Sequence, residues 1–160
     1  WEPLIHPNVI GMNAQLWGEV IRSFSQVEWQ IYPKIYGLAE RAWNNRSVLT
    51  LGDYNQLVYE VFLPQLAESN RNFHIQQPGI LANDLHVTMN KVMTKGQILY
   101  RIDNSDWMTY EQPFTLSETA EIIQAKVKYL GKESNTTWLW MEDEHEVNTE
   151  NQEQNTSATF

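Results

Sequence analysis

Apolar and polar positions alternate along residues 8–19. One set of alternate positions is apolar or small throughout, and the other set becomes polar toward its end. The first set is Ile10, Met12, Ala14, Leu16 and Gly18, and the second is Val9, Gly11, Asn13, Gln15, Trp17 and Glu19. Because successive side chains of a strand point to opposite faces, this pattern predicts a β-strand. Such a strand suits a (β/α)8 barrel, where one face packs on the outer helices and the other reaches the active site.

A helical period replaces the alternation after residue 24. Residues 25–28 read Ser-Gln-Val-Glu, which is a capping-box pattern. Apolar side chains then recur at helical spacing through Trp43, namely Ile31, Ile35, Leu38, Ala39 and Ala42. Pro33 lies too far along this helix to be a first-turn proline, so we expect a kink or a broken turn there. A second helix is expected over about residues 52–69, with Pro64 as another local disturbance and a buried stripe of Leu57, Val61, Leu63 and Leu66.

The character of the chain changes around residues 70–79, where Gln-Gln-Pro-Gly at 76–79 indicates a turn or linker. Beyond it, short alternating runs predict strands. Leu85, Val87 and Met89 alternate in the first run, and Ile98, Tyr100 and Ile102 in the second. A longer run at 120–130 has two faces, one with Glu121, Ile123, Ala125, Val127 and Tyr129 and the other with Ile122, Gln124, Lys126 and Lys128. Turn-like breaks at 103–106, 112–113 and Gly131 separate the runs at spacings typical of a β-sandwich.

Composition and charge argue against several classes of binding partner and site. The formal net charge is −9, and residues 141–160 hold six acids and no Lys or Arg, so the acidity is mostly a property of this tail. A negative chain without clustered Lys and Arg argues against a nucleic-acid partner. No apolar run approaches the roughly 20 residues that span a bilayer, and the absence of cysteine excludes disulfides and Cys-based zinc sites. The chain begins at Trp1 without a signal-peptide pattern, so we expect it to be part of a longer protein.

Trp17 and Glu19 are the candidate binding residues. Their spacing places an indole and a carboxylate on the same face at the end of the predicted strand. An indole can pack on the C–H surface of a sugar while an ionised carboxylate accepts strong hydrogen bonds from its hydroxyls. A core tryptophan beside a surface glutamate is the structural alternative. The four histidines (His6, His74, His86 and His145) lack the i, i+4 spacing of a helical zinc site, so we predict no metal.

Three motifs in order resemble the closing strand and helix of family 20 β-N-acetylhexosaminidases, which are glycoside hydrolases. Residues 11–19 read GMNAQLWGE, residues 32–34 read YPK and residues 38–43 read LAERAW. The family pattern is G-x-Q-x-Q-L-W-x-E, then Y/F-P-R, then A-L-A-E-R-A-W. Asn13 and Lys34 depart from it, since Gln and Arg are commoner there, but neither departure touches Trp17 or Glu19.

The resemblance implies a function for this strand. Trp17 would line the pocket around the terminal N-acetylhexosamine, and Glu19 would bind its outer hydroxyls. The implied reaction is retaining and substrate-assisted, so the acetamido group of the substrate replaces the usual nucleophilic carboxylate. The family's catalytic Asp-Glu pair lies on an earlier strand, and the dipeptide occurs here only at Asp143-Glu144 in the acidic tail. We therefore expect no catalytic residue in this chain. Glu40 and Arg41 are expected to form an ion pair or a loop contact.

The second half has its own resemblance, to the immunoglobulin-like domain that follows the barrel in bacterial chitobiases. It rests on residues 96–103 (GQILYRID), Trp107, Tyr110, residues 113–114 (PF) and residues 131–134 (GKES). In such a domain Asp103 is expected to form a turn and Trp107 to pack. A free carbohydrate-binding or scaffold sandwich is the alternative function, although it would have no use for the helices of residues 20–70.

The predicted fold is therefore an α+β fragment. The last β/α unit of a (β/α)8 barrel and a following helix occupy residues 1–72, and a linker follows at 73–79. An all-β immunoglobulin-like sandwich covers 80–141, and an acidic, disordered tail covers 142–160. The expected partners are an N-acetylhexosamine-containing oligosaccharide and the remainder of the barrel, without a cofactor, nucleic acid or membrane span. The resemblance places the parent protein in the periplasm or outside the cell.

Overall fold

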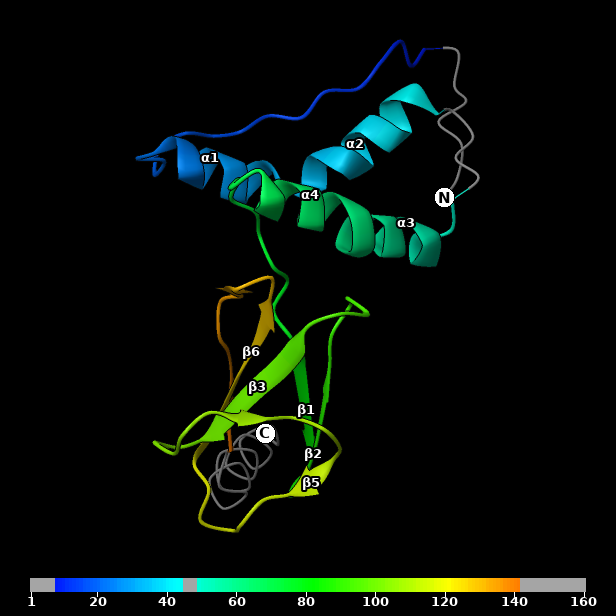
Figure 1. The fold of residues 1–160 in the computed structure, drawn as a ribbon. Coiled ribbons are helices and arrows are strands. Elements are labelled where there is room, and N and C mark those ends of the chain that lie inside the picture. Colours follow the sequence, from blue (N-terminus) through cyan, green and yellow to red (C-terminus); the bar gives the residue numbers. More distant parts are fainter. Residues whose placement is uncertain (1–7, 45–48, 142–160) are drawn as a thin grey trace, which may run out of the picture.

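The computed structural model describes residues 8–44 and 49–141 of the chain, and the predicted acidic tail at 142–160 lies outside them. The described residues form a helical half followed by a half made of antiparallel strands (Figure 1). The fold is therefore a mixture of helices and antiparallel sheet, as predicted at this level. No described helix is long and apolar enough to cross a membrane.

The first helical pattern folds as two helices, α1 (Phe24–Ile31) and α2 (Lys34–Trp43). They are separated at Pro33, which follows a cis peptide bond, so the predicted break is confirmed. The predicted capping box is wrong by two residues: Ser23 caps α1 and forms the box with Gln26. Glu28 does not serve the helix end because its carboxylate is bound to residues that follow the last helix.

The second predicted helix is present as a nearly continuous run of three elements, but Val61 of its predicted buried stripe is exposed. The three elements are α3 (Leu51–Leu57), a π-helical turn (Val58–Phe62) and α4 (Leu63–Glu68). Thr50 caps α3 through a capping box with Asp53. Pro64 has no N–H to donate into the helix, and the wide turn lies immediately upstream of it. The disturbance expected at Pro64 is thus present.

The strand predicted at residues 8–19 is not formed. This segment runs extended past the helices (Figure 1), its side chains are exposed, and it has no strand pairing. Alternation of side chains makes a strand favourable only when a neighbouring strand satisfies its backbone N–H and C=O groups. Among the described residues no strand lies beside this segment, so the pattern alone does not produce a strand.

The strands form two antiparallel sheets. The smaller sheet has the order β1-β2-β5, with bounds β1 (Gly79–Asn83), β2 (His86–Asn90) and β5 (Phe114–Thr115). The larger sheet has the order β4-β3-β6-β7, and β8 also pairs with β6. Its bounds are β3 (Gln97–Ile102), β4 (Met108–Thr109), β6 (Ile122–Tyr129), β7 (Lys132–Glu133) and β8 (Thr137–Trp140).

One hydrophobic core joins the two halves. Its largest fully buried side chains come from the second helical run, from the connecting segment and from both sheets: Val58, Leu63, Phe73, Ile75, Val87, Ile123 and Val127. Burial alternates along β2, where Val87 and Met89 are buried, whereas in β6 Ile122 and Gln124 are buried as well as Ile123, Ala125 and Val127. The hydroxyl of Tyr129 on β6 also donates to the carbonyl of Tyr59 at 2.6 Å, which ties the sheet to the helical run.

Candidate functional site

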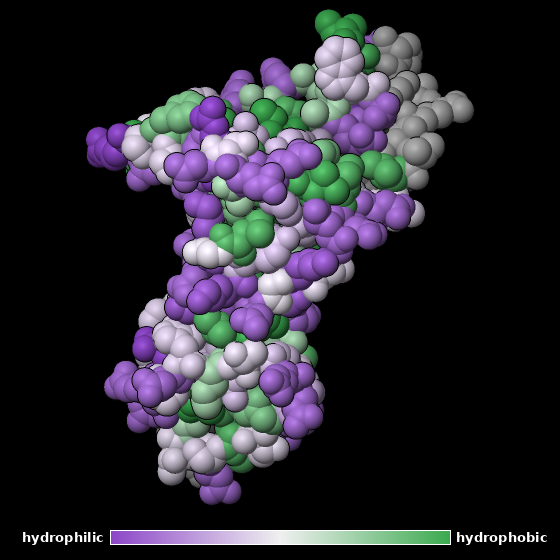
Figure 2. All heavy atoms as spheres, viewed as in Figure 1, coloured by the Kyte–Doolittle hydropathy of each residue, from purple (hydrophilic) through white to green (hydrophobic). Residues whose placement is uncertain are grey.

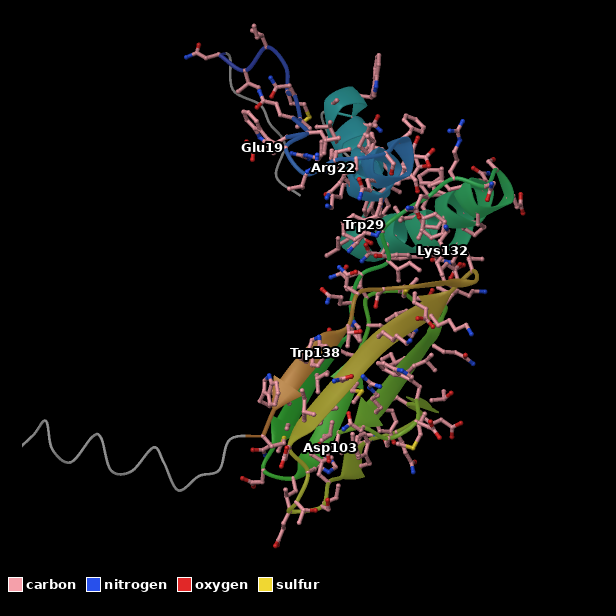
Figure 3. The ribbon with its side chains drawn as sticks, turned by 90° about the vertical axis from the view of Figure 1, so that its left-hand side faces the viewer. Glu19, Arg22, Trp29, Asp103, Lys132 and Trp138 are labelled. Carbon is pink, nitrogen blue, oxygen red and sulfur yellow. The ribbon has the colours of Figure 1, made fainter. Side chains whose placement is uncertain are left out.

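Trp17 and Glu19 lie in the extended segment that precedes α1. Trp17 is 76% exposed, and Glu19 is exposed as well. A turn closes the segment directly after them, since the N–H of Ile21 donates to the carbonyl of Gly18 at 3.1 Å. Figure 3 shows Glu19 on the outer side of the helical half, far from the strands. Both side chains are accessible to a ligand, and the described residues do not enclose them in a pocket.

A hollow lies between this segment and the end of α2. It has a volume of about 430 Å³ and is lined by residues 9–12 of the segment and by Arg41, Ala42 and Trp43 of α2. The apolar residues that line it are strongly exposed: Ile10 is 103% exposed and Trp43 is 88% exposed. Figure 2 shows further hydrophobic patches on the surface of the helical half. This half therefore presents apolar surface that a folded protein ordinarily covers.

Glu28 is a buried carboxylate that the sequence interpretation assigned to a helix cap. Its Oε1 lies 2.9 Å from Nη1 of Arg71, and its Oε2 accepts the N–H of Asn72 at 3.0 Å. The hydrogen bond from Asn72 is the main cause that lowers the pKa of Glu28, and the Arg71 guanidinium adds to it against the opposing effect of burial. Its place on the helix gave no signal of burial, because Phe24, one turn earlier on the same face, is 67% exposed. Because every contact of this carboxylate is internal, its role is structural.

The junction between the halves continues from Glu28 toward the strands. Lys132 of β7 donates to Oδ1 of Asn72 at 3.3 Å, and its ammonium lies 5.4 Å from the centre of the Phe73 ring. On the other side, His74 packs edge-on against Trp29 of α1 with ring centres 4.7 Å apart. Figure 3 places Trp29 and Lys132 at this junction. Burial, followed by the charge of Lys34, lowers the pKa of His74.

No group of His, Asp and Glu side chains among the described residues is arranged to hold a metal ion. Asp103 has a structural role: it adopts a positive φ of 50°, and its Oδ1 accepts the N–H groups of Glu121 and Ile122. The turn expected at Asp103 is thus confirmed. Glu40 accepts a hydrogen bond from the side chain of Asn44 at 3.0 Å, one turn farther along α2.

The model of the glycosyl hydrolase family 20 catalytic domain matches residues 2–46, the part of the chain that contains Trp17 and Glu19. This part of the chain is therefore similar to the catalytic domain of glycosyl hydrolase family 20. The N,N'-diacetylchitobiase of Vibrio harveyi is 23% identical over 145 residues, which cover 76% of this chain and 16% of that protein. The Beta-hexosaminidase B of Pseudoalteromonas piscicida is 46% identical over 35 residues, which cover 22% of this chain and 4% of that protein.

The family resemblance inferred from the three motifs is confirmed by these matches. The chain spans a small fraction of the length of these curated relatives. The similarity is thus to a glycosyl hydrolase catalytic domain, a diacetylchitobiase and a hexosaminidase. The roles of Trp17 and Glu19 remain predictions.

Proposed function

We propose that this chain is the C-terminal part of a β-N-acetylhexosaminidase. The enzyme would remove terminal N-acetylglucosamine or N-acetylgalactosamine from chito-oligosaccharides or glycans by a retaining, substrate-assisted mechanism. The observation that carries the proposal is the match of residues 2–46 to the family 20 catalytic domain, because these residues include the candidate sugar-binding pair. The chain would work in the periplasm or outside the cell.

Trp17 and Glu19 hold the sugar in this proposal. The indole of Trp17 supplies an apolar surface for the ring and the acetamido methyl of the substrate. The carboxylate of Glu19 accepts hydrogen bonds from hydroxyl groups of the same sugar, and an ionised acceptor forms the stronger bonds. Both side chains are exposed in the described chain, so they are open to substrate. The proton transfers belong to an Asp-Glu pair outside this chain.

The conformation of residues 8–22 fits a strand that lacks its neighbours. The segment alternates as a barrel strand does, yet it is unpaired, and Ile10, Leu16 and Val20 expose large apolar side chains. In a complete barrel, adjacent strands would satisfy its backbone and the outer helices would cover its apolar face. We assign residues 8–43 to the last β/α unit of the barrel and the two sheets to an immunoglobulin-like sandwich.

The test measures hydrolysis of a chromogenic N-acetyl-β-glucosaminide by the longer enzyme and by the 160-residue chain. We expect the longer enzyme to be active and the isolated chain to be inactive, because it lacks the general acid. In the longer enzyme, Glu19→Gln should lower kcat/KM by roughly 10- to 100-fold through weakened hydrogen bonds to hydroxyls. Trp17→Ala should enlarge the sugar pocket and raise KM.

The matched control is Glu118→Gln, which makes the same substitution at an exposed glutamate of the strand half. It should leave kcat/KM unchanged. Wild-type kcat/KM in both the Glu19 and the Trp17 variants would show that the site assignment is wrong. Activity of the 160-residue chain alone would contradict the placement of the general acid outside it.

A further inference from the structure

The two faces of the larger sheet differ in character. The inner face carries Ile98, Tyr100, Ile123, Ala125, Val127 and Leu139, which contribute to the core. The outer face carries a cluster that we call the tryptophan face, made of Arg101, Trp107, Gln124, Lys126, Trp138 and Trp140. Trp138 is 55% exposed and Trp140 is 66% exposed. The proposed catalytic mechanism uses none of these residues.

Strand register brings the residues of the tryptophan face together. Gln124 of β6 lies opposite Arg101 of β3 on one side and opposite Trp138 of β8 on the other. Directly opposed residues of antiparallel strands project from the same face. Trp140 follows Trp138 by two positions, so it projects from that face as well. Figure 3 shows Trp138 beside the strands, away from the helical half and from Glu19.

The polar groups of the tryptophan face are fixed by contacts among themselves. The Arg101 guanidinium lies 5.0 Å from the centre of the Trp107 ring, and the Lys126 ammonium lies 4.1 Å from it. Nε of Arg101 donates to Oε1 of Gln124, and Lys126 is paired with Glu133 at 2.7 Å. Contacts of this kind hold long side chains in defined positions, which lowers the entropy cost of binding a ligand.

We propose that the tryptophan face is a second carbohydrate-binding site, which takes a neutral N-acetylated oligosaccharide. The identity of the sugar rests on the proposed hexosaminidase function. Two half-exposed indoles on one strand offer apolar surface to the C–H faces of adjacent sugars. The Arg101 guanidinium beside them carries further N–H donors, which complement a ligand rich in hydroxyl and carbonyl oxygens, whereas Gln124 is buried and Lys126 is paired with Glu133. The pairing of Lys126 with Glu133 limits the net charge of the face, which favours a neutral glycan over a polyanion.

The site would hold the enzyme on its polymer while the catalytic pocket acts on a chain end. Its position on the strand half, away from Glu19, allows both sites to be occupied independently. Binding by the tryptophan face should therefore be present in the 160-residue chain, which the proposed function expects to be catalytically inactive. A failure of the proposed second site can therefore be distinguished from a failure of the proposed enzyme function.

The experiment titrates the 160-residue chain with chitohexaose and follows binding by isothermal titration calorimetry and by tryptophan fluorescence. We expect saturable binding that weakens by roughly tenfold in Trp138→Ala and in Trp140→Ala, because each variant removes a large apolar contact. The double variant should lose binding. Trp138→Phe should retain part of the affinity, and circular dichroism should show that the variants remain folded.

The control is Trp43→Ala on α2, which removes an exposed indole from the helical half. This variant should bind chitohexaose as the unmodified chain does. Absence of saturable binding, or equal affinity in the Trp138 and Trp140 variants, would overturn the second site. Binding lost in Trp17→Ala alone would also overturn it, and would instead support the sugar-binding role of Trp17.

Discussion

Glu28 of α1 is bound to Arg71, which lies 43 positions later in the segment that leads into the strands. The side chain of Glu28 is almost fully buried, at 9% exposed, while that of Arg71 is 53% exposed. The second carboxylate oxygen accepts the N–H of Asn72. These contacts therefore hold α1 against the segment that leads from α4 to the sheets.

Replacing Glu28 should destabilise the chain more than replacing Arg71. Glu28→Ala leaves the N–H of Asn72 and the guanidinium without their buried acceptor, whereas Arg71→Ala removes a largely solvated partner and leaves one hydrogen bond in place. We expect the midpoint of thermal unfolding to fall in the order wild type, Arg71→Ala, Glu28→Ala. Equal midpoints for the two variants would show that the buried acceptor is not the important partner.

The same carboxylate should give the chain an acid-sensitive step. The folded pKa of Glu28 is lowered from its ordinary value of 4.5, so its contribution is present above that pH and is lost as the pH falls through the folded pKa. Glu28→Gln keeps an acceptor but cannot titrate. Urea denaturation between pH 6 and pH 3 should show a shallower loss of stability in this variant. An unchanged slope would contradict the assignment.

The titration of His74 should change the stability of the chain in a higher pH range. Its folded pKa is lowered from 6.5 by burial, so the folded state disfavours the protonated form and stability falls as the pH drops below 6.5. His74→Phe retains a ring against Trp29 and removes the titration. Stability measured from pH 8 to pH 5 should lose this component in His74→Phe and keep it in His86→Gln, the control at an exposed histidine of β2.

Local sequence patterns predicted those helices and strands whose packing and hydrogen-bonding partners lie within the described chain. The alternation in β6 placed Ile123, Ala125 and Val127 on one face, and all three are buried, although Ile122 and Gln124 of the opposite face are buried too. Residues 8–19 alternate just as clearly, but a strand requires a hydrogen-bonding neighbour that the pattern cannot provide. The two-residue strands β4, β5 and β7 are too short to show any period.

The candidate sites also differ in this way: some rest on local spacing, and others rest on residues distant in the sequence. The spacing of Trp17 and Glu19 sufficed to select them, and the family match now covers both residues. Glu28 was assigned to a cap because a capping box is a local pattern, while its partners Arg71 and Asn72 lie more than 40 positions away. The tryptophan face depends on the register of three strands, which side-chain alternation alone does not determine.

Shortening a core side chain of β6 should cost far more than shortening an exposed one of the same type. Ile123 is fully buried, whereas Ile10 in the extended segment is fully exposed. Ile123→Ala leaves a cavity and should lower the free energy of unfolding by about 2–5 kcal/mol. Ile10→Ala should change it by no more than about 0.5 kcal/mol. Chemical denaturation of both variants measures the difference, and similar losses would mean that the extended segment is packed in solution.

Gly96, directly before β3, and Gly131, in the turn between β6 and β7, offer a matched pair of glycines. Both have positive φ, 84° and 74°, so an alanine at either position should cost roughly 1–2 kcal/mol through its backbone conformation. A Cβ on Gly96 would also lie 3.0 Å from the carbonyl oxygen of Lys128 and 3.2 Å from Cβ of Tyr129, while a Cβ on Gly131 meets nothing within 4 Å. Gly96→Ala should therefore be the more destabilising of the two in urea denaturation. The reverse order would mean that β3 and β6 do not approach each other closely at Gly96.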